Sequence, residues 1–359
     1  MRVLIVDTWY ARVLEKVYDE RPGLTEGSYD EQWRALMGTF FGTADSYSRY
    51  LGELGHVAHE AVVNCEPLQA AWLRESGQPL RSPRFRRIPQ RDLVLLAQAA
   101  AFRPDVVYVQ DVAALAPATL RRLRRDHLLV GQIATELPPH AVLRRYDFLV
   151  SSFPHYVTRL PKKGIPTEYL GIGFEPRVLD HLDATAQPAN ATIFVGALGR
   201  IQHAESNGLL ARAAELVPID FYGLGVEEWP EDSPIRRGYR GEAFGLDMYR
   251  LLASAKIALN RHGAVAEGYA NNMRLYEATG VGTLLLTDAK QNLSDLFEPG
   301  TEVVTYTSAE DAADKIRYYL EHEDERAAIA RAGQARTLGE HTYAQRMREL
   351  EQILNRNAK

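Results

Sequence analysis

A strand–helix–strand unit between Ile257 and Asp288 constrains the fold of this chain more than any other segment. Residues 257–260 (IALN) are a short apolar run that predicts a buried strand, and residues 283–287 (TLLLT) predict the next strand. Between them, residues 273–279 (MRLYEAT) predict a helix that Gly280 and Gly282 end. Two buried strands joined by a helix indicate a parallel sheet, whose ligands bind at the carboxyl ends of its strands.

The rest of the chain repeats this alternation of strand and helix. Further buried strands are predicted at residues 2–6, 56–63, 106–109, 128–133, 146–150, 192–195, 219–222 and 302–305. Helical patterns lie between them, at residues 41–54, 92–102, 120–125, 155–160, 203–216, 246–253, 309–320, 324–333 and 343–354. The fold class predicted is α/β, with two doubly wound, Rossmann-like domains.

A chain of 359 residues exceeds one typical hydrophobic core, which also favours two domains. We expect an N-terminal domain at 1–176, a linker at 177–190, a C-terminal domain at 191–338 and a terminal helix at 339–359. The linker is expected there because this stretch is polar and rich in Asp, Ala, Gln and Pro. Residues 11–40 read as a long loop, either a functional lid or a surface excursion.

The loop after residue 260 has the composition of an anion-binding turn. Arg261 and His262 follow the predicted strand, Gly268 permits a tight turn, and Asn271 or Asn272 can cap the helix that begins at Met273. A glycine-bearing loop that leads into a helix presents free backbone N–H groups to a pyrophosphate. The sequence therefore predicts a diphosphate site here.

Three segments carry a resemblance to a known family. Residues 270–288 (ANNMRLYEATGVGTLLLTD), residues 296–300 (LFEPG) and residues 341–343 (HTY) with Arg346 resemble the donor-binding half of group 1 glycosyltransferases, nearest to the spore-maturation (CgeB-like) branch. The resemblance extends from about Ile193 to Leu350. It implies the GT-B architecture, in which two domains face a cleft, and a terminal helix that crosses back to the first domain. It also implies metal-independent sugar transfer from a nucleoside diphosphate sugar, with retention of configuration.

The resemblance also assigns donor-binding residues. Glu277 matches the carboxylate that holds the donor ribose, and many members place a second glutamate at Tyr269, where this chain has Glu267 nearby instead. Arg274 would either form an intrahelical ion pair with Glu277 or contact phosphate. The residues predicted to bind the donor are Gly196, Gly199, Arg200, His203, Tyr222, Gly223, Arg261, His262, Gly268, Tyr269, Asn271, Asn272, Met273, Arg274 and Glu277.

The first half of the chain supplies the acceptor-side candidates. Asp7, Trp9, Tyr10 and Asp111 follow predicted strands and are expected to bind the acceptor. Glu136 and His140 follow the strand at 128–133 and, with Arg200 and Arg261 of the second half, are the catalytic candidates.

Composition excludes several other classes. A net charge of −5 argues against a general nucleic-acid binder, although arginines at 81–91 and 121–125 form basic patches. The single cysteine, Cys65, excludes a disulfide and a cysteine-rich metal site, and no Asp-x-Asp pair follows a strand, so we expect no metal and no cofactor besides the donor substrate.

No apolar run is long enough to span a bilayer, and the N-terminal apolar run ends at Asp7, unlike a signal peptide. We therefore expect a cytoplasmic protein. The acceptor is left open as a glycan, lipid, protein or small molecule, and a homo-oligomer also stays open.

Two other functions remain compatible with these patterns. A sugar-nucleotide epimerase or phosphorylase-type enzyme could use the same two domains without needing an acceptor. A non-catalytic sugar-nucleotide-binding protein would bind the donor without turnover, which the tyrosine at position 269 would fit. A product assay separates all three.

Overall fold

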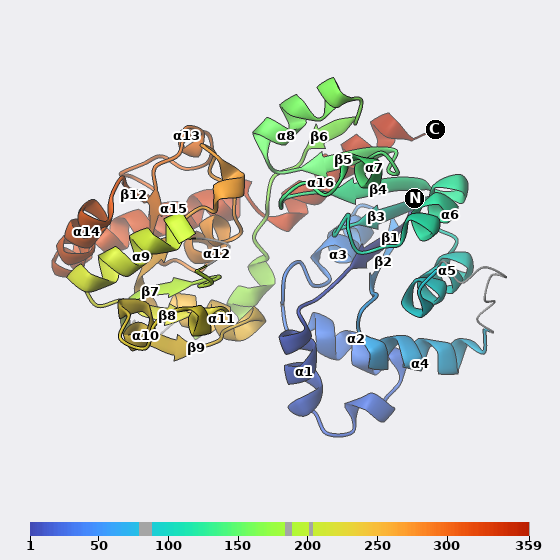
Figure 1. Ribbon diagram of the computed structural model, residues 1–359, viewed down its shortest axis with the longest axis horizontal. Coiled ribbons are helices and arrows are strands. Elements are labelled where there is room, and N and C mark those ends of the chain that lie inside the picture. The colour runs from blue at the N-terminus through green and yellow to red at the C-terminus, as the bar shows by residue number, and fades with distance from the viewer. Residues whose placement is uncertain (79–87, 184–188, 201–203, 359) are drawn as a thin grey trace. The chain divides into compact units, whose positions relative to one another are not determined.

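The computed structural model describes residues 1–78, 88–183, 189–200 and 204–358, which divide into two units (Figure 1). The first unit comprises Met1–Gly171 together with Tyr343–Lys359, and the second comprises Ile172–Thr342. The chain thus leaves the first unit before the segment 177–190 that we expected as a linker. The 3-10 helix η3 (Pro176–His181) of the second unit includes the first residues of that segment.

Six parallel strands form the sheet of the first unit, in the order β2-β1-β3-β4-β5-β6. The inner strands β1, β3 and β5 are nearly continuous apolar runs, as in parallel sheets that helices cover on both faces, and residues 3–6 of β1 are all buried. The strands are β1 (Arg2–Asp7), β2 (Val57–Val62), β3 (Val106–Val109), β4 (Leu128–Gln132), β5 (Phe148–Ser151) and β6 (Thr167–Tyr169).

The helices of the first unit include the last helix of the chain. Helix α16 packs on α3, and side chains of both join one core with Val3 and Ile5 of β1. Leu4 points to the opposite face, which α5 covers. The helices are α1 (Ala11–Asp19), α2 (Tyr29–Met37), α3 (Ser46–Glu53), α4 (Glu66–Ser76), α5 (Gln90–Phe102), α6 (Pro117–Asp126), α7 (His140–Leu143), α8 (Pro154–Arg159), α16 (Tyr343–Asn357) and the 3-10 helices η1 (Leu24–Glu26) and η2 (Pro161–Lys163).

The prediction of a long loop at 11–40 is wrong, because α1, η1 and α2 occupy this segment. Val13 and Val17 of α1 are four residues apart and both buried, which gives the helix one apolar face. Ser28 and Glu31 form a capping box at the start of α2, since each side chain accepts a hydrogen bond from the other residue's backbone N–H. The segment is thus helical for ordinary local reasons.

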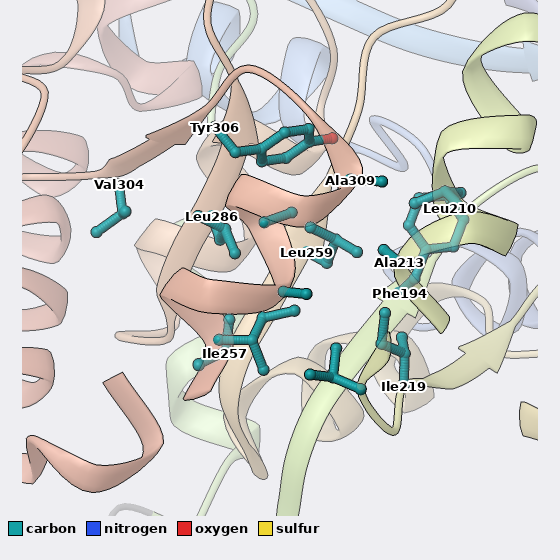
Figure 2. Packing of buried hydrophobic residues seen from close by; sticks show 14 of the residues in the cluster. Phe194, Leu210, Ala213, Ile219, Ile257, Leu259, Leu286, Val304, Tyr306 and Ala309 are labelled. Atoms are coloured by element: carbon teal, nitrogen blue, oxygen red, sulfur yellow. The ribbon is translucent and has the colours of Figure 1, made fainter. Parts of the chain in front are cut away.

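The second unit also has a six-stranded parallel sheet, in the order β12-β11-β10-β7-β8-β9. Figure 2 shows the core on one of its faces, where Phe194, Ile257 and Leu286 of the sheet meet Leu210 of α9 and Ala309 of α14. The strands are β7 (Asn190–Val195), β8 (Asp220–Tyr222), β9 (Tyr239–Gly241), β10 (Ala255–Asn260), β11 (Leu284–Asp288) and β12 (Val304–Tyr306).

Helices α11 and α12 contact β10 of this sheet, and α14 packs against α9. The helices of the second unit are α9 (Ala204–Leu216), α10 (Pro234–Gly238), α11 (Gly245–Ala253), α12 (Arg274–Gly280), α13 (Leu293–Leu296), α14 (Ala309–Glu321), α15 (Glu323–Glu340) and the 3-10 helices η3, η4 (Val226–Glu228) and η5 (Ala264–Ala266). Across the described part of the chain, no helix is both long and apolar enough to cross a membrane.

Each sheet has a point where the strand order reverses, and such points are where open α/β sheets bind ligands. In the second unit the reversal lies between β7 and β10, so the residues after 195 and after 260 meet there. In the first unit it lies between β1 and β3, which brings the residues after 6 and after 109 together.

Candidate donor site

Arg261 is a buried cation at the reversal point of the second sheet. Its guanidinium donates from Nε to Asn207 Oδ1 at 2.7 Å and from Nη2 to the Ala197 carbonyl at 2.9 Å. No carboxylate among the described residues forms an ion pair with it, and burial lowers the pKa of Arg261 to about 10. The charge of Asp288 opposes this fall, but Asp288 lies beyond ion-pair distance and is itself paired with His262 and Lys290. A buried charge without a direct ion-pair partner is costly, so this position favours binding of an anion.

His262 lies beside Arg261 and is fixed by Asp288 at the end of β11. Asp288 Oδ1 accepts hydrogen bonds from the His262 backbone N at 3.1 Å and from Nδ1 at 2.6 Å. Burial raises the pKa of Asp288, but the hydrogen bonds and charges of His262 and Lys290 outweigh it and hold that pKa below its ordinary value. An ionised carboxylate only accepts, so Nδ1 carries a hydrogen, and the buried Nε2 has no partner in the described part of the chain.

The loop that follows His262 is clamped by the residues after β11. Asn292 accepts from the Ala270 backbone N at 2.6 Å and donates to the Ala270 carbonyl, while Gln291 donates its backbone N–H to Gly268. Within this loop Glu267, the residue before Gly268, has a positive φ, with φ 52° and ψ −122°. A strained non-glycine residue persists only where its surroundings hold it, which is typical of ligand-binding loops.

Helix α12 follows this loop and begins one residue later than predicted. Met273 is its N-cap and makes no side-chain cap, but Asn272 Oδ1 accepts from the Leu275 backbone N at 3.2 Å. Asn272 also donates to the Asn260 side chain and to the Arg261 carbonyl. Asn272 therefore positions the loop, and Asn271 and Tyr269 beside it are partly exposed.

Glu277 and Arg274 form a buried ion pair. Of the two roles predicted for Arg274, an ion pair with Glu277 or a phosphate contact, the structure shows the ion pair. Arg274 Nη1 lies 2.9 Å from Glu277 Oε2, and Arg274 Nε donates to the Val195 carbonyl at 3.2 Å. Burial raises the pKa of Glu277, although Arg274 and a hydrogen bond from Tyr249 oppose the rise. Only 7% of the Glu277 side chain is exposed, and its carboxylate already has Arg274 and Tyr249 as partners within the protein.

The glycine loop at 196–200 is not a free cradle of backbone N–H groups. Gly196 donates to the Tyr222 carbonyl at 3.0 Å and Leu198 to the Leu224 carbonyl at 2.7 Å, so these two amides are occupied. Gly223 adopts φ 143°, and a Cβ there would lie 1.8 Å from the Gly196 carbonyl oxygen. The two loops pack backbone to backbone, which explains their glycines without a ligand.

The remaining donor candidates of this loop differ in accessibility. Arg200 is exposed and lies over the Trp229 ring at 5.9 Å, while Gly199 is packed against Glu228. His203 lies outside the described residues. Arg200 can therefore reach a ligand, whereas Gly196, Gly199 and Gly223 shape the loop.

In the first unit, Asp7 and Asp111 meet at the carboxyl ends of β1 and β3. Asp7 accepts from Thr8 N at 2.8 Å and from Trp9 Nε1 at 3.2 Å, and Thr8 Oγ1 donates to Asp111 Oδ2 at 3.1 Å. Burial, together with the charge of Asp111, raises the pKa of Asp7 to about 7. These oxygens can accept hydrogen bonds from hydroxyl groups.

Trp9 and Tyr10 have different roles from each other. Trp9 is buried and exchanges hydrogen bonds with Asn64, so it supports the loop, contrary to the prediction of a ligand contact. Tyr10 is 59% exposed and packs edge-on against Phe41 at 5.4 Å. Tyr10 therefore stays an acceptor-side candidate.

Glu136 and His140 lie after β4 and are both exposed. His140 begins α7, and its Nε2 lies 3.2 Å from the Lys163 carbonyl. They therefore remain catalytic candidates by their position at the end of a strand.

Sequence analysis missed Asp288, Lys290 and Asn207. The signal for Asp288 was present, because β10 and β11 pair Asn260 with Thr287, which places Asp288 next to Arg261 and His262. Within the described residues, no group of three or more His, Cys, Asp or Glu side chains could hold a metal ion.

Comparison with known proteins identifies the class to which this geometry belongs. Residues 203–352 match the family model described as glycosyl transferase-like, and the two parallel six-stranded sheets match GT-B structures along the whole chain. The chain has the GT-B fold, and its residues 203–352 are similar to glycosyltransferases. No curated protein matches it in sequence.

Three solved structures illustrate the likeness. A glycosyltransferase from Rickettsia africae has a TM-score of 0.61 at 13% identity, covering 100% of this chain and 98% of that one. Anabaena HepE in complex with UDP-glucose has a TM-score of 0.63 at 14% identity, covering 99% and 100%. AviGT4, of avilamycin A biosynthesis, has a TM-score of 0.56 at 16% identity, covering 100% and 98%. At these identities the likeness shows the fold.

Proposed function

We propose that this protein transfers a sugar from a nucleoside diphosphate sugar to a hydroxyl-bearing acceptor, without a metal ion and with retention of configuration. Retention and metal independence follow from the resemblance to group 1 glycosyltransferases, including its spore-maturation branch. Because HepE binds UDP-glucose, UDP-sugars are the first donors to test. The donor would bind in the second unit and the acceptor in the first.

One observation carries the donor assignment. Arg261 is a buried guanidinium with no ion-pair partner in the described part of the chain, and the next residue, His262, carries a buried Nε2 without a partner. A diphosphate would supply the missing negative charge. As the bond to the sugar breaks, charge grows on the leaving phosphate, and a preorganised guanidinium stabilises that charge.

Asp288 supports this arrangement by fixing the imidazole. It holds the ring through Nδ1, which leaves the buried Nε2 as a hydrogen-bond acceptor in the neutral ring and as a donor when the ring is protonated. The neutral ring can accept a hydrogen bond from a sugar hydroxyl, and the protonated ring can donate one to a phosphate oxygen. In the first unit, Asp7 and Asp111 would accept hydrogen bonds from the hydroxyl groups of the acceptor.

The donor assignment is tested by calorimetric titration of UDP and UDP-sugars in the presence of a chelator. Loss of one charge-assisted hydrogen bond costs about 1.5–3 kcal/mol, so H262A is expected to weaken binding roughly 10- to 150-fold. The matched control is H322A, because His322 is an exposed histidine of the same unit that stacks on Tyr318. Equal affinities for H262A, H322A and wild type would reject the site.

Turnover is tested separately by incubating donor with a panel of glycans, lipids and small alcohols and analysing products by mass spectrometry and NMR. A product whose anomeric configuration equals that of the donor supports retention, and an inverted product rejects it. Donor consumption without an acceptor would instead indicate an epimerase or phosphorylase-type reaction.

A further inference from the structure

A pocket lies in the first unit, on the sheet face that α4 and α5 cover. It has a volume of about 290 Å³, and its floor is formed by Leu4, His59 and Ala61 of β1 and β2. Arg2 lines the pocket at the start of β1, whereas Asp7 lies at the other end of the same strand. Five residues at about 3.3 Å each separate the two ends by roughly 16 Å, so this pocket is distinct from the acceptor candidates.

Four of the nine residues that line the pocket carry aromatic rings, namely Tyr29 of α2, His59, Trp72 of α4 and Phe102 of α5. Tyr29 and Phe102 pack against His59, whose Nε2 is 2.8 Å from the Tyr29 hydroxyl. Burial lowers the pKa of His59 to about 4, so the ring is neutral at pH 7. Among the described residues that line the pocket, the charged side chain is Arg2, which lies over Phe102 at 4.5 Å.

One buried polar atom in this lining has no partner. Gln69 Nε2 donates to the Val62 carbonyl at 2.9 Å, so Gln69 Oε1 must be the acceptor for Gln98 Nε2 at 2.9 Å. This chain of hydrogen bonds fixes the orientation of Gln98 and leaves its Oε1 unpartnered among the described residues, although Gln98 is 5% exposed. A buried acceptor of this kind is stabilised by a hydrogen-bond donor.

These features together define the ligand. Gln98 Oε1 requires a donor and disfavours an anion, while Arg2 disfavours a cation, which leaves a neutral molecule with hydroxyl or N–H groups. The rings of Tyr29 and Phe102 are tilted from that of His59 by 47° and 39°. The nearly parallel ring of Trp33 stacks directly on His59 at 5.3 Å and does not line the pocket, so no open parallel slot remains for a flat heterocycle. A puckered ring with C–H groups on its faces fits tilted aromatic rings.

We propose that this pocket is an accessory saccharide-binding site that holds one neutral pyranose ring of a glycan. Its aromatic rings contact the C–H faces of the sugar, and a sugar hydroxyl donates to Gln98 Oε1. The proposal does not depend on the donor assignment, because every residue that carries it lies in the first unit.

The test is saturation-transfer NMR on the full-length protein without nucleotide, using the methyl glycosides of glucose, galactose and N-acetylglucosamine, with uridine as the flat comparison ligand. Binding of at least one glycoside is expected. Ala101 is exposed and lines the pocket, so A101W would block it without disturbing the core and weaken binding at least tenfold. W72L, which removes one aromatic wall, is the second variant.

Two controls locate the binding. Y169L removes an exposed aromatic ring elsewhere in the first unit and is expected to leave glycoside binding unchanged. H262A tests the candidate donor site and is also expected to leave it unchanged. The proposal is overturned if no glycoside binds, if A101W and W72L bind like wild type, if H262A abolishes binding, or if uridine alone occupies the pocket.

Discussion

The buried pair of Arg274 and Glu277 makes a quantitative prediction about stability. Their side chains are 13% and 7% exposed, so E277Q leaves a buried guanidinium without its acid. Breaking such a pair from one side costs about 3–5 kcal/mol, and R274M is expected to cost a similar amount because it leaves a buried carboxylate. For a unit of this size, that lowers the melting temperature by roughly 6–20 °C.

The double variant R274M/E277Q separates the pair from its surroundings. Because neither charge remains, its loss of stability should be well below the sum of the two single losses. Urea unfolding followed by circular dichroism measures all four proteins, and R317M/D314N is the matched control at an exposed pair of the same spacing. Exposed pairs contribute about 0.2–1 kcal/mol, so additive losses of that size for Arg274 and Glu277 would refute the reasoning.

Three further substitutions test the fold. Glu60 is 2% exposed, and burial raises its pKa to about 8 from an ordinary 4.5, so between these values the folded state binds more protons than the unfolded state. The contribution of Glu60 to the unfolding free energy should therefore fall with rising pH, by at most about 1.4 kcal/mol per unit. The difference in unfolding free energy between wild type and E60Q should fall in the same way, as urea titrations at several pH values would show. G223A should destabilise by several kcal/mol or prevent folding, because its Cβ would overlap the Gly196 carbonyl. G208A, in α9 with no atom within 4 Å of the new Cβ, should be neutral or stabilise by up to about 1 kcal/mol in thermal unfolding. A stable G223A would contradict the backbone packing described above.

The alternation of apolar runs and helical segments was enough to predict the fold class. The strand predicted at 257–260 is β10 (Ala255–Asn260), and the helix predicted at 273–279 is α12 (Arg274–Gly280). The loop predicted at 11–40 failed although its Ser28–Glu31 capping box is a readable signal. The sequence did not predict that the chain enters the second unit at Ile172. The segment that forms η3 is polar, and its assignment to the second unit depends on tertiary contacts.

The candidate site was predicted only in part, for a similar reason. Arg261 and His262 were found because the end of a parallel strand is a local feature, and Asp288 could have been found from strand pairing. Whether the backbone amides of Gly196 and Leu198 are free depends on a second loop about 25 residues away, which already accepts from them. Residue propensities and motif spacing do not reveal whether a backbone amide already donates a hydrogen bond to a loop that is distant in the sequence.

The position of α16 has a consequence for how the protein is made. Met347 and Leu350 of this helix belong to the core of the first unit, yet they are separated from Gly171 by the whole second unit. At a synthesis rate of about 5–20 residues per second, the ribosome needs roughly 10–35 s to produce that intervening segment. During this interval the apolar surface around Tyr47 and Leu51 lacks its covering helix. The N-terminal part of the nascent chain is thus a binding target for chaperones until translation ends, and the second unit is the one that can complete its core first.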